Sequence, residues 1–147
     1  RRLISFGLSP QLKTNFEQIF SAPFLIEMLL VELGNTPDAD IVVRLHFDGA
    51  FQISTTAATV AAAEPEREKA AQDWLNGKIA GSQDRKSVIE RCLEAWWRLI
   101  EGKEFSEEPP SDWRNSLKDK VVEIGWLERK TTRQARYVPL SAEEIGL

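Results

Sequence analysis

The sequence predicts an α+β protein that is mostly helical. Three observations support this fold class. Apolar residues recur at helical spacing over long stretches in both halves of the chain. Residues 41–55 alternate between apolar and polar side chains on either side of Asp48-Gly49, which is typical of a β-hairpin. Residues 126–140 indicate a second hairpin, because apolar and aromatic residues flank a basic turn there.

The composition is ordinary for a globular chain. The 147 residues are 42% hydrophobic and 29% charged, and a chain of this length buries a substantial core without disulfides. We place a boundary near residue 63, so that 1–63 and 64–147 form two parts that could share one core. The chain starts with Arg1 instead of Met, so we interpret it as a piece of a longer polypeptide. No run of about 18 apolar residues occurs, so we expect a cytoplasmic protein without a membrane span.

Two helices are predicted in the N-terminal part. Ser9-Pro10 opens the first, because Ser caps free amides and Pro fits the first turn. Its apolar stripe continues to Ile19 and Phe20. The second helix runs from Pro23 to about Leu33, and almost all of its positions are apolar. We therefore expect this helix to be buried, against the same chain or against a partner.

The register of the first hairpin follows from its apolar pattern. A two-residue loop at Asp48-Gly49 would pair Arg44 with Ile53 and mix apolar and polar side chains on one face. A three-residue loop at 48–50 pairs Leu45 with Ile53 and keeps the apolar residues of both strands together. We therefore predict the longer loop or a bulge.

Three helices are predicted in the C-terminal part. The first begins at Pro65 and stops at Gly77 or Gly81, and the second, about 85–101, is capped by Asp84. An acidic linker leads to Ser111, which caps a third helix through Ile124. The buried stripe of this last helix has spacings of 4, 4 and 3 residues and consists of Trp113, Leu117, Val121 and Ile124.

Positive charge gathers at the end of a mildly acidic chain. The net charge is −4, yet residues 111–136 contain seven cations and four anions. Four cations occupy the turn of the second hairpin: Arg129, Lys130, Arg133 and Arg136. The predicted polar face of the preceding helix adds Arg114, Asn115 and Lys118. Arg and Lys bind phosphates or guanine edges, and Asn binds adenine, so this pattern favours nucleic-acid binding.

The order of these features resembles the C-terminal part of winged helix-turn-helix domains. The resemblance covers at most residues 85–140 and rests on an apolar helix, Gly125, a basic turn and the strand Tyr137-Val138-Pro139-Leu140. It implies that the helix before the wing enters the major groove and that the wing touches the backbone or the minor groove. The chain departs from the family pattern because the helix at 85–101 is long and its connector is acidic.

Other residues give weaker indications of function. We expect His46 on the polar side of the first hairpin, near Arg44 and Gln52, without the partners of a catalytic or metal site. Cys92 falls in an apolar helical pattern, which predicts a buried structural thiol. Trp96 fits the helix core, and Trp97 either joins a broad buried face or anchors a protein contact.

We therefore expect a non-catalytic module of a larger cytoplasmic protein, with winged-helix character, that binds DNA or RNA or serves assembly. No cofactor or metal site is expected. The alternative is a protein–protein interaction or oligomerisation module without nucleic-acid contact. In that case the partner would meet Phe24, Met28 and Trp97, and the basic turn would be solvated.

Overall fold

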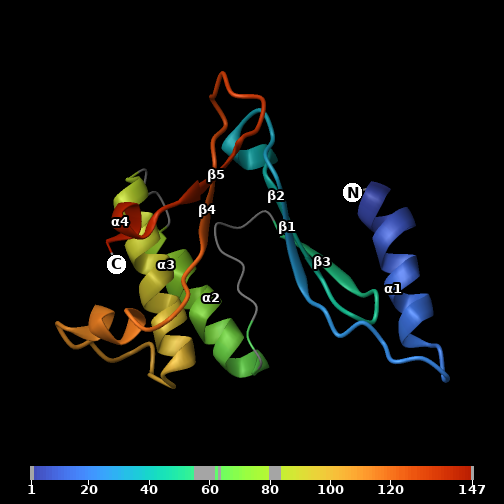
Figure 1. Ribbon diagram of the computed structural model, residues 1–147, viewed down its shortest axis with the longest axis horizontal. Coiled ribbons are helices and arrows are strands. Elements are labelled where there is room, and N and C mark those ends of the chain that lie inside the picture. Colours follow the sequence, from blue (N-terminus) through green and yellow to red (C-terminus); the bar gives the residue numbers. More distant parts are fainter. Residues whose placement is uncertain (1, 55–61, 63, 80–83, 147) are drawn as a thin grey trace. The chain divides into compact units, whose positions relative to one another are not determined.

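The computed structural model describes residues 2–54, 62, 64–79 and 84–146 (Figure 1). The chain divides into two units, Arg1–Ala61 and Ala62–Leu147. Each unit combines helices with a small antiparallel sheet, which confirms the predicted α+β fold class. None of the described helices is long and apolar enough to cross a membrane.

The first unit begins with a continuous helical stretch. A π-helical segment η1 (Leu3–Leu8) leads directly into α1 (Ser9–Phe16). The α-helix begins at Ser9 as predicted, but Ser9 does not cap it, because helical backbone already precedes it and the Ser9 hydroxyl donates a hydrogen bond of 2.5 Å to the Gly49 carbonyl. The helix also ends before the predicted stripe does, so that Ile19 and Phe20 are exposed.

A three-stranded antiparallel sheet completes the first unit. Its strands are β1 (Met28–Glu32), β2 (Ile41–Leu45) and β3 (Phe51–Ser54), in the order β1-β2-β3, and a short helix η2 (Pro37–Ala39) precedes β2. The predicted second helix, Pro23 to Leu33, is therefore wrong. A short apolar run satisfies both helical and strand patterns, and here the ladder with β2 decides in favour of a strand.

The hairpin β2–β3 has the predicted loop length at a different position. His46 N donates to Ala50 O at 2.8 Å, so that the loop consists of residues 47–49. Leu45 pairs with Phe51 and not with Ile53, yet the apolar residues still share one face, as expected. Gly49 explains the position, because a three-residue loop ends in a left-handed residue and Gly49 has φ +86°.

The helical stretch covers one face of this sheet. The buried residues are Ile4 and Leu12 from the helix and Val43 and Leu45 from β2, and partly buried apolar side chains surround them. Residues of β1 on the same face include Met28 and Leu30, because directly paired residues of an antiparallel ladder point to one side.

Two long helices, α2 (Pro65–Ile79) and α3 (Arg85–Ile100), begin the second unit (Figure 1). The predicted cap is confirmed, because the Asp84 carboxylate accepts a hydrogen bond from Ser87 N at 2.9 Å. Gly77 does not end α2, which continues to Ile79. The other expected stop, Gly81, lies outside the described residues.

The predicted helix Ser111–Ile124 is wrong. Only η3 (Trp113–Leu117), a short 3-10 helix, forms there. The β-branched residues that follow favour extended backbone, and Ile124 pairs with Leu140. The second hairpin is confirmed, as β4 (Ile124–Leu127) and β5 (Tyr137–Leu140), and a short helix α4 (Ala142–Ile145) follows.

The core of the second unit joins α3 to η3, β5 and α4. Trp97 is 4% exposed and its ring centroid lies 5.6 Å from that of Trp113. Trp96, which the sequence predicts in the helix core, is partly buried and packs against this cluster. The remaining buried members of the cluster are Ile89, Leu93, Leu117, Leu140 and Ile145.

A buried ion pair fixes the acidic connector to α3. Arg98 is 2% exposed, and its Nη2 donates to Glu94 Oε1 at 2.8 Å and to the Glu107 carbonyl at 2.7 Å. Its Nη1 donates to the Glu104 carbonyl, and the rings of Trp74, Trp97 and Phe105 surround the guanidinium. The connector therefore contacts α3 through its carbonyl groups.

Candidate nucleic-acid interface

The basic turn lies at the tip of the β4–β5 hairpin. We call residues 128–136 the hairpin tip. Glu128 N donates to Arg136 O at 2.9 Å, so that one further backbone hydrogen bond continues the ladder into this segment. Lys130 and Arg136 are exposed, and neither forms an ion pair with another described residue. Their charges are therefore open to a ligand.

Arg133 has partners within the tip. Its Nη2 is ion-paired with the Glu128 carboxylate, and its Nε lies 3.3 Å from Thr131 Oγ1. The side chain of Arg129 is half-buried and has an interaction of its own. The four cations and Glu128 give the tip a net charge of +3. Of these cations, Lys130 and Arg136 have no ion-pair partner among the described residues.

Three contacts hold the base of the hairpin. The Tyr137 ring lies against Gly125, which has no side chain to displace it. The Arg85 guanidinium lies 5.2 Å from the Trp126 ring centre and 3.5 Å from Glu144 Oε1, so that it links α3 to β4 and α4. Hydrogen bonds from Ser141, with a further contribution from Arg85, lower the pKa of Glu144.

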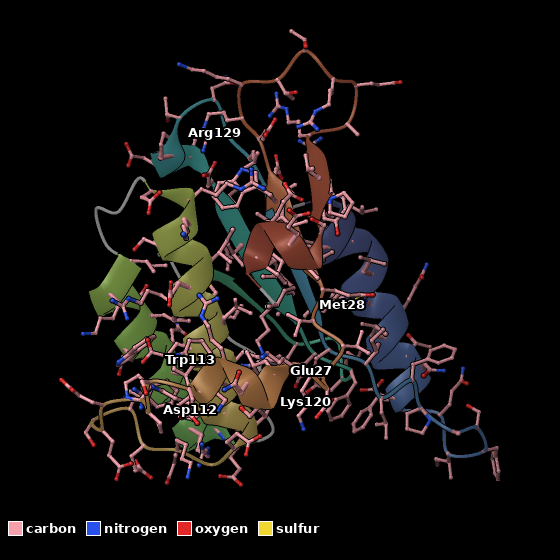
Figure 2. All side chains as sticks on the ribbon, turned by 60° about the vertical axis from the view of Figure 1, so that its left-hand side comes forward. Glu27, Met28, Asp112, Trp113, Lys120 and Arg129 are labelled. Carbon is pink, nitrogen blue, oxygen red and sulfur yellow. The ribbon has the colours of Figure 1, made fainter. Side chains whose placement is uncertain are left out.

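The predicted polar face of the last helix does not form part of this surface. Arg114 is half-buried: its Nη2 lies 3.1 Å from Glu90 Oε1, and its Nη1 donates to the Gly146 carbonyl at 3.2 Å. Asn115 and Lys118 are exposed beside it. Figure 2 places Arg129 at the opposite end of this unit from Asp112 and Trp113. The structure thus separates the two groups of cations that the sequence joined.

The residues expected at a protein interface lie in different environments. Phe24 is exposed, whereas Met28 is half-buried against the core of the first unit. Trp97 is buried, so it cannot meet a partner without a change in the core of the second unit. The exposed apolar residues that the sequence did not single out include Leu29 and Val31 of β1.

His46 belongs to a three-residue charge cluster in the first unit. Its Nδ1 lies 3.1 Å from Glu27 Oε1, and Arg44 Nη2 donates to Glu27 Oε2 at 2.9 Å. The hydrogen bond from Arg44, assisted by the charges of Arg44 and His46, lowers the pKa of Glu27. The sequence predicts His46 near Arg44 but not their contact with Glu27, because Glu27 lies within the predicted helix 23–33.

Cys92 differs from its expected environment. Its side chain is exposed at a cleft of about 350 Å³ between α3 and the segment before β4, and Trp96 and Val122 also line this cleft. Neighbouring atoms remove part of its hydration and raise the pKa of the thiol, which disfavours the reactive thiolate. Among the described residues, no group of three or more His, Cys, Asp and Glu side chains has the spacing of a metal site.

Comparisons with family models, with characterised proteins and with solved structures find no match to this chain.

Proposed function

We propose that the chain is a non-catalytic module that contacts the sugar-phosphate backbone of nucleic acid through the hairpin tip. One observation carries the proposal. The tip concentrates four cations around a single carboxylate, and the rest of the chain has a net charge of −7. Lys130 and Arg136 are exposed there, where phosphate oxygens can accept hydrogen bonds from both.

The geometry favours contact with phosphates over recognition of bases. Base recognition of the winged-helix type uses a helix that enters the major groove. Here that position holds η3, of five residues, and Arg114 beside it is engaged with Glu90 and with the C-terminal carbonyls. Binding through the tip should therefore depend little on nucleotide sequence.

The experiment measures binding of the chain to a labelled duplex by fluorescence anisotropy at low salt. The variant Lys130→Ala/Arg136→Ala should bind at least about tenfold more weakly, because two phosphate contacts are lost. The matched control is Lys69→Ala/Lys103→Ala, which removes the same charge from exposed positions outside the tip. Equal binding by the two double variants would show that the tip is not the site.

A second candidate function is protein docking without nucleic-acid contact. The specific observation is that exposed large apolar side chains concentrate in the first unit. Among the described residues they include five of its phenylalanines: Phe6, Phe16, Phe20, Phe24 and Phe51. Apolar surface of this kind is typical of interaction sites. In this case the wild-type chain would not change the anisotropy of the duplex at low salt.

A further inference from the structure

Strand β1 has the side-chain pattern of an interior strand although it lies at an edge of its sheet. Four successive residues, Met28-Leu29-Leu30-Val31, are apolar, so that both faces of the strand are apolar. A strand with such a run is usually covered on both faces and paired on both edges. In the described sheet β1 pairs with β2 only, and Leu29 and Val31 are exposed.

Along Met28–Val31 the outer edge of β1 carries none of the usual protection against pairing, and its one charge, Glu32, lies at the end of the strand. Natural edge strands contain Lys, Pro, a bulge or an inward-pointing charge, which prevents addition of another strand. Residues 28–32 contain no Lys, Arg, Pro or Gly, and their five residues pair with β2 in continuous register. The backbone edge of β1 is therefore well formed for accepting a further strand.

An apolar cleft lies beside this edge. It has a volume of about 180 Å³, and its walls come from η1 and from the first two strands. Three successive β1 residues, Leu30, Val31 and Glu32, form one wall, opposite Leu3 and Leu8. A side chain on the helix-covered side of an added strand would point towards this cleft, which has room for one large apolar group.

The charge at the end of β1 indicates the chemistry of the partner. Glu32 is exposed at the cleft and forms no ion pair with another described residue. The carboxylate at the other end, Glu27, is by contrast engaged by Arg44 and His46. A strand added along β1 therefore meets one open negative charge, at the Glu32 end.

We propose that β1 binds an extended segment of a partner protein, which adds to the sheet as a fourth strand. The segment has apolar residues at alternate positions, one of which enters the cleft, and a Lys or Arg opposite Glu32. Main-chain hydrogen bonds supply affinity in this mode of recognition, and the pocket and the charge supply specificity. The inference deepens the docking function and is independent of nucleic-acid contact at the hairpin tip.

A second copy of this chain fits the edge less well than a basic partner. Two β1 strands could pair antiparallel in several registers. Glu32 of one copy would then lie opposite Glu27, Met28 or another apolar residue of the second copy. None of these pairings brings a cation to Glu32. Like charges directly opposite each other in a ladder are destabilising, so a partner with a basic residue is favoured.

The experiment selects peptides from a random twelve-residue display library on the immobilised full chain. We expect enriched peptides with alternating apolar residues and a Lys or Arg near one end. A synthetic peptide of the enriched sequence should bind the wild-type chain, and Val31→Lys should weaken its binding at least tenfold. Glu32→Lys should shift the preference at the basic position to an acidic residue.

Gln52→Lys is the matched control, because it places the same charge at an exposed position on the same face of the sheet, in the opposite edge strand β3. Circular dichroism compares the folding of all variants, and light scattering reports self-association. Absence of enrichment would overturn the proposal. Enriched peptides that bind Val31→Lys as tightly as they bind the wild-type chain would also overturn it. A wild-type dimer that Val31→Lys dissociates would overturn it in favour of a second copy. If the wild-type chain failed to bind the duplex, the function proposed for the hairpin tip would be contradicted, and the proposal for β1 would be unchanged.

Discussion

Tyr137 lies across the strand pair from Gly125 and packs its ring on the glycine backbone. A Cβ added at Gly125 would lie 2.8 Å from both Cζ and Oη of Tyr137, closer than side chains approach one another. Gly125 pairs with Pro139 and Tyr137 with Leu127, so the ring covers its diagonal neighbour on the same face of the ladder. This contact fixes the base of the hairpin that carries the basic tip.

Gly125→Ala should destabilise the second unit by about 1 kcal/mol or more, because the Tyr137 ring must leave its position. The measurement is urea unfolding followed by Trp fluorescence, since all five Trp residues lie in this unit. Gly77→Ala is the control with the opposite expected sign. No atom lies near its added Cβ, and Ala is favoured over Gly in a helix by about 1 kcal/mol. Equal midpoints for the two variants would show that the ring contact contributes nothing.

The buried pair of Glu94 and Arg98 gives a larger effect. Arg98→Met should cost about 3–5 kcal/mol of unfolding free energy, because it leaves the Glu94 carboxylate buried without its main partner. Arg91→Met removes the other, half-exposed partner of Glu94 and should cost less than about 1 kcal/mol. The double variant Glu94→Leu/Arg98→Met should recover the part of the loss that comes from the buried carboxylate, but not the part that comes from the Glu104 and Glu107 carbonyls, which still lack their donor. A double variant as unstable as Arg98→Met would contradict the account of the buried charge.

The cap of α3 can be tested separately. Asp84→Ala removes the acceptor of the Ser87 amide and should lower the unfolding free energy by about 1 kcal/mol. Asp84→Ser keeps an acceptor and should retain most of the stability. Thermal unfolding monitored by Trp fluorescence compares the two variants. If both lose the same stability, the side-chain hydrogen bond is not the reason for the effect.

The Glu27 cluster predicts an acid-sensitive first unit. Arg44 lowers the pKa of Glu27 below its ordinary value of 4.5, so the ion pair stabilises the folded state above that value. This contribution is lost as the pH falls below 4.5 and through the lowered pKa of the folded state. Urea unfolding followed by far-UV circular dichroism, at pH values from 7 to 3, measures how the unfolding free energy depends on pH.

The acid limb of the stability profile is the part in which the unfolding free energy falls as the pH is lowered. Glu27→Gln should make this limb less steep. Glu17→Gln, which removes an exposed carboxylate 3.9 Å from Lys13, should leave the limb as steep as in wild type. An equally steep limb in Glu27→Gln would assign the acid sensitivity to other groups.

The elements that the sequence predicts well are those whose signals are local. Pro65 and Asp84 mark the starts of α2 and α3, and alternation with a glycine or a basic turn marks both hairpins. The two predicted helices that are absent fail for a common reason. Apolar residues at 23–33 and 111–124 have helical spacing, but Met28–Glu32 pairs with β2, 9 to 17 residues away along the chain, and Ile124 pairs with Leu140, 16 residues away. The spacing of these residues does not reveal the pairing, because a short apolar run fits a helix as well as a strand.

The candidate site shows the same limit. The sequence identifies the cations of the hairpin tip because all four lie within one short turn segment between two strands. It also assigns Arg114 to nucleic acid, since the partner Glu90 is 24 residues away and belongs to another element. The open edge of β1 was hidden because its residues were assigned to a helix, in which a backbone edge does not exist.

The most direct test of the central claim is the salt dependence of duplex binding. The logarithm of the association constant is plotted against the logarithm of salt concentration for wild type and for Lys130→Ala/Arg136→Ala. Each lost phosphate contact reduces the magnitude of the slope by about 0.9, so the account predicts a reduction of about 1.8, equal for two unrelated duplex sequences. An unchanged slope, or a reduction confined to one sequence, would contradict backbone contact by the hairpin tip.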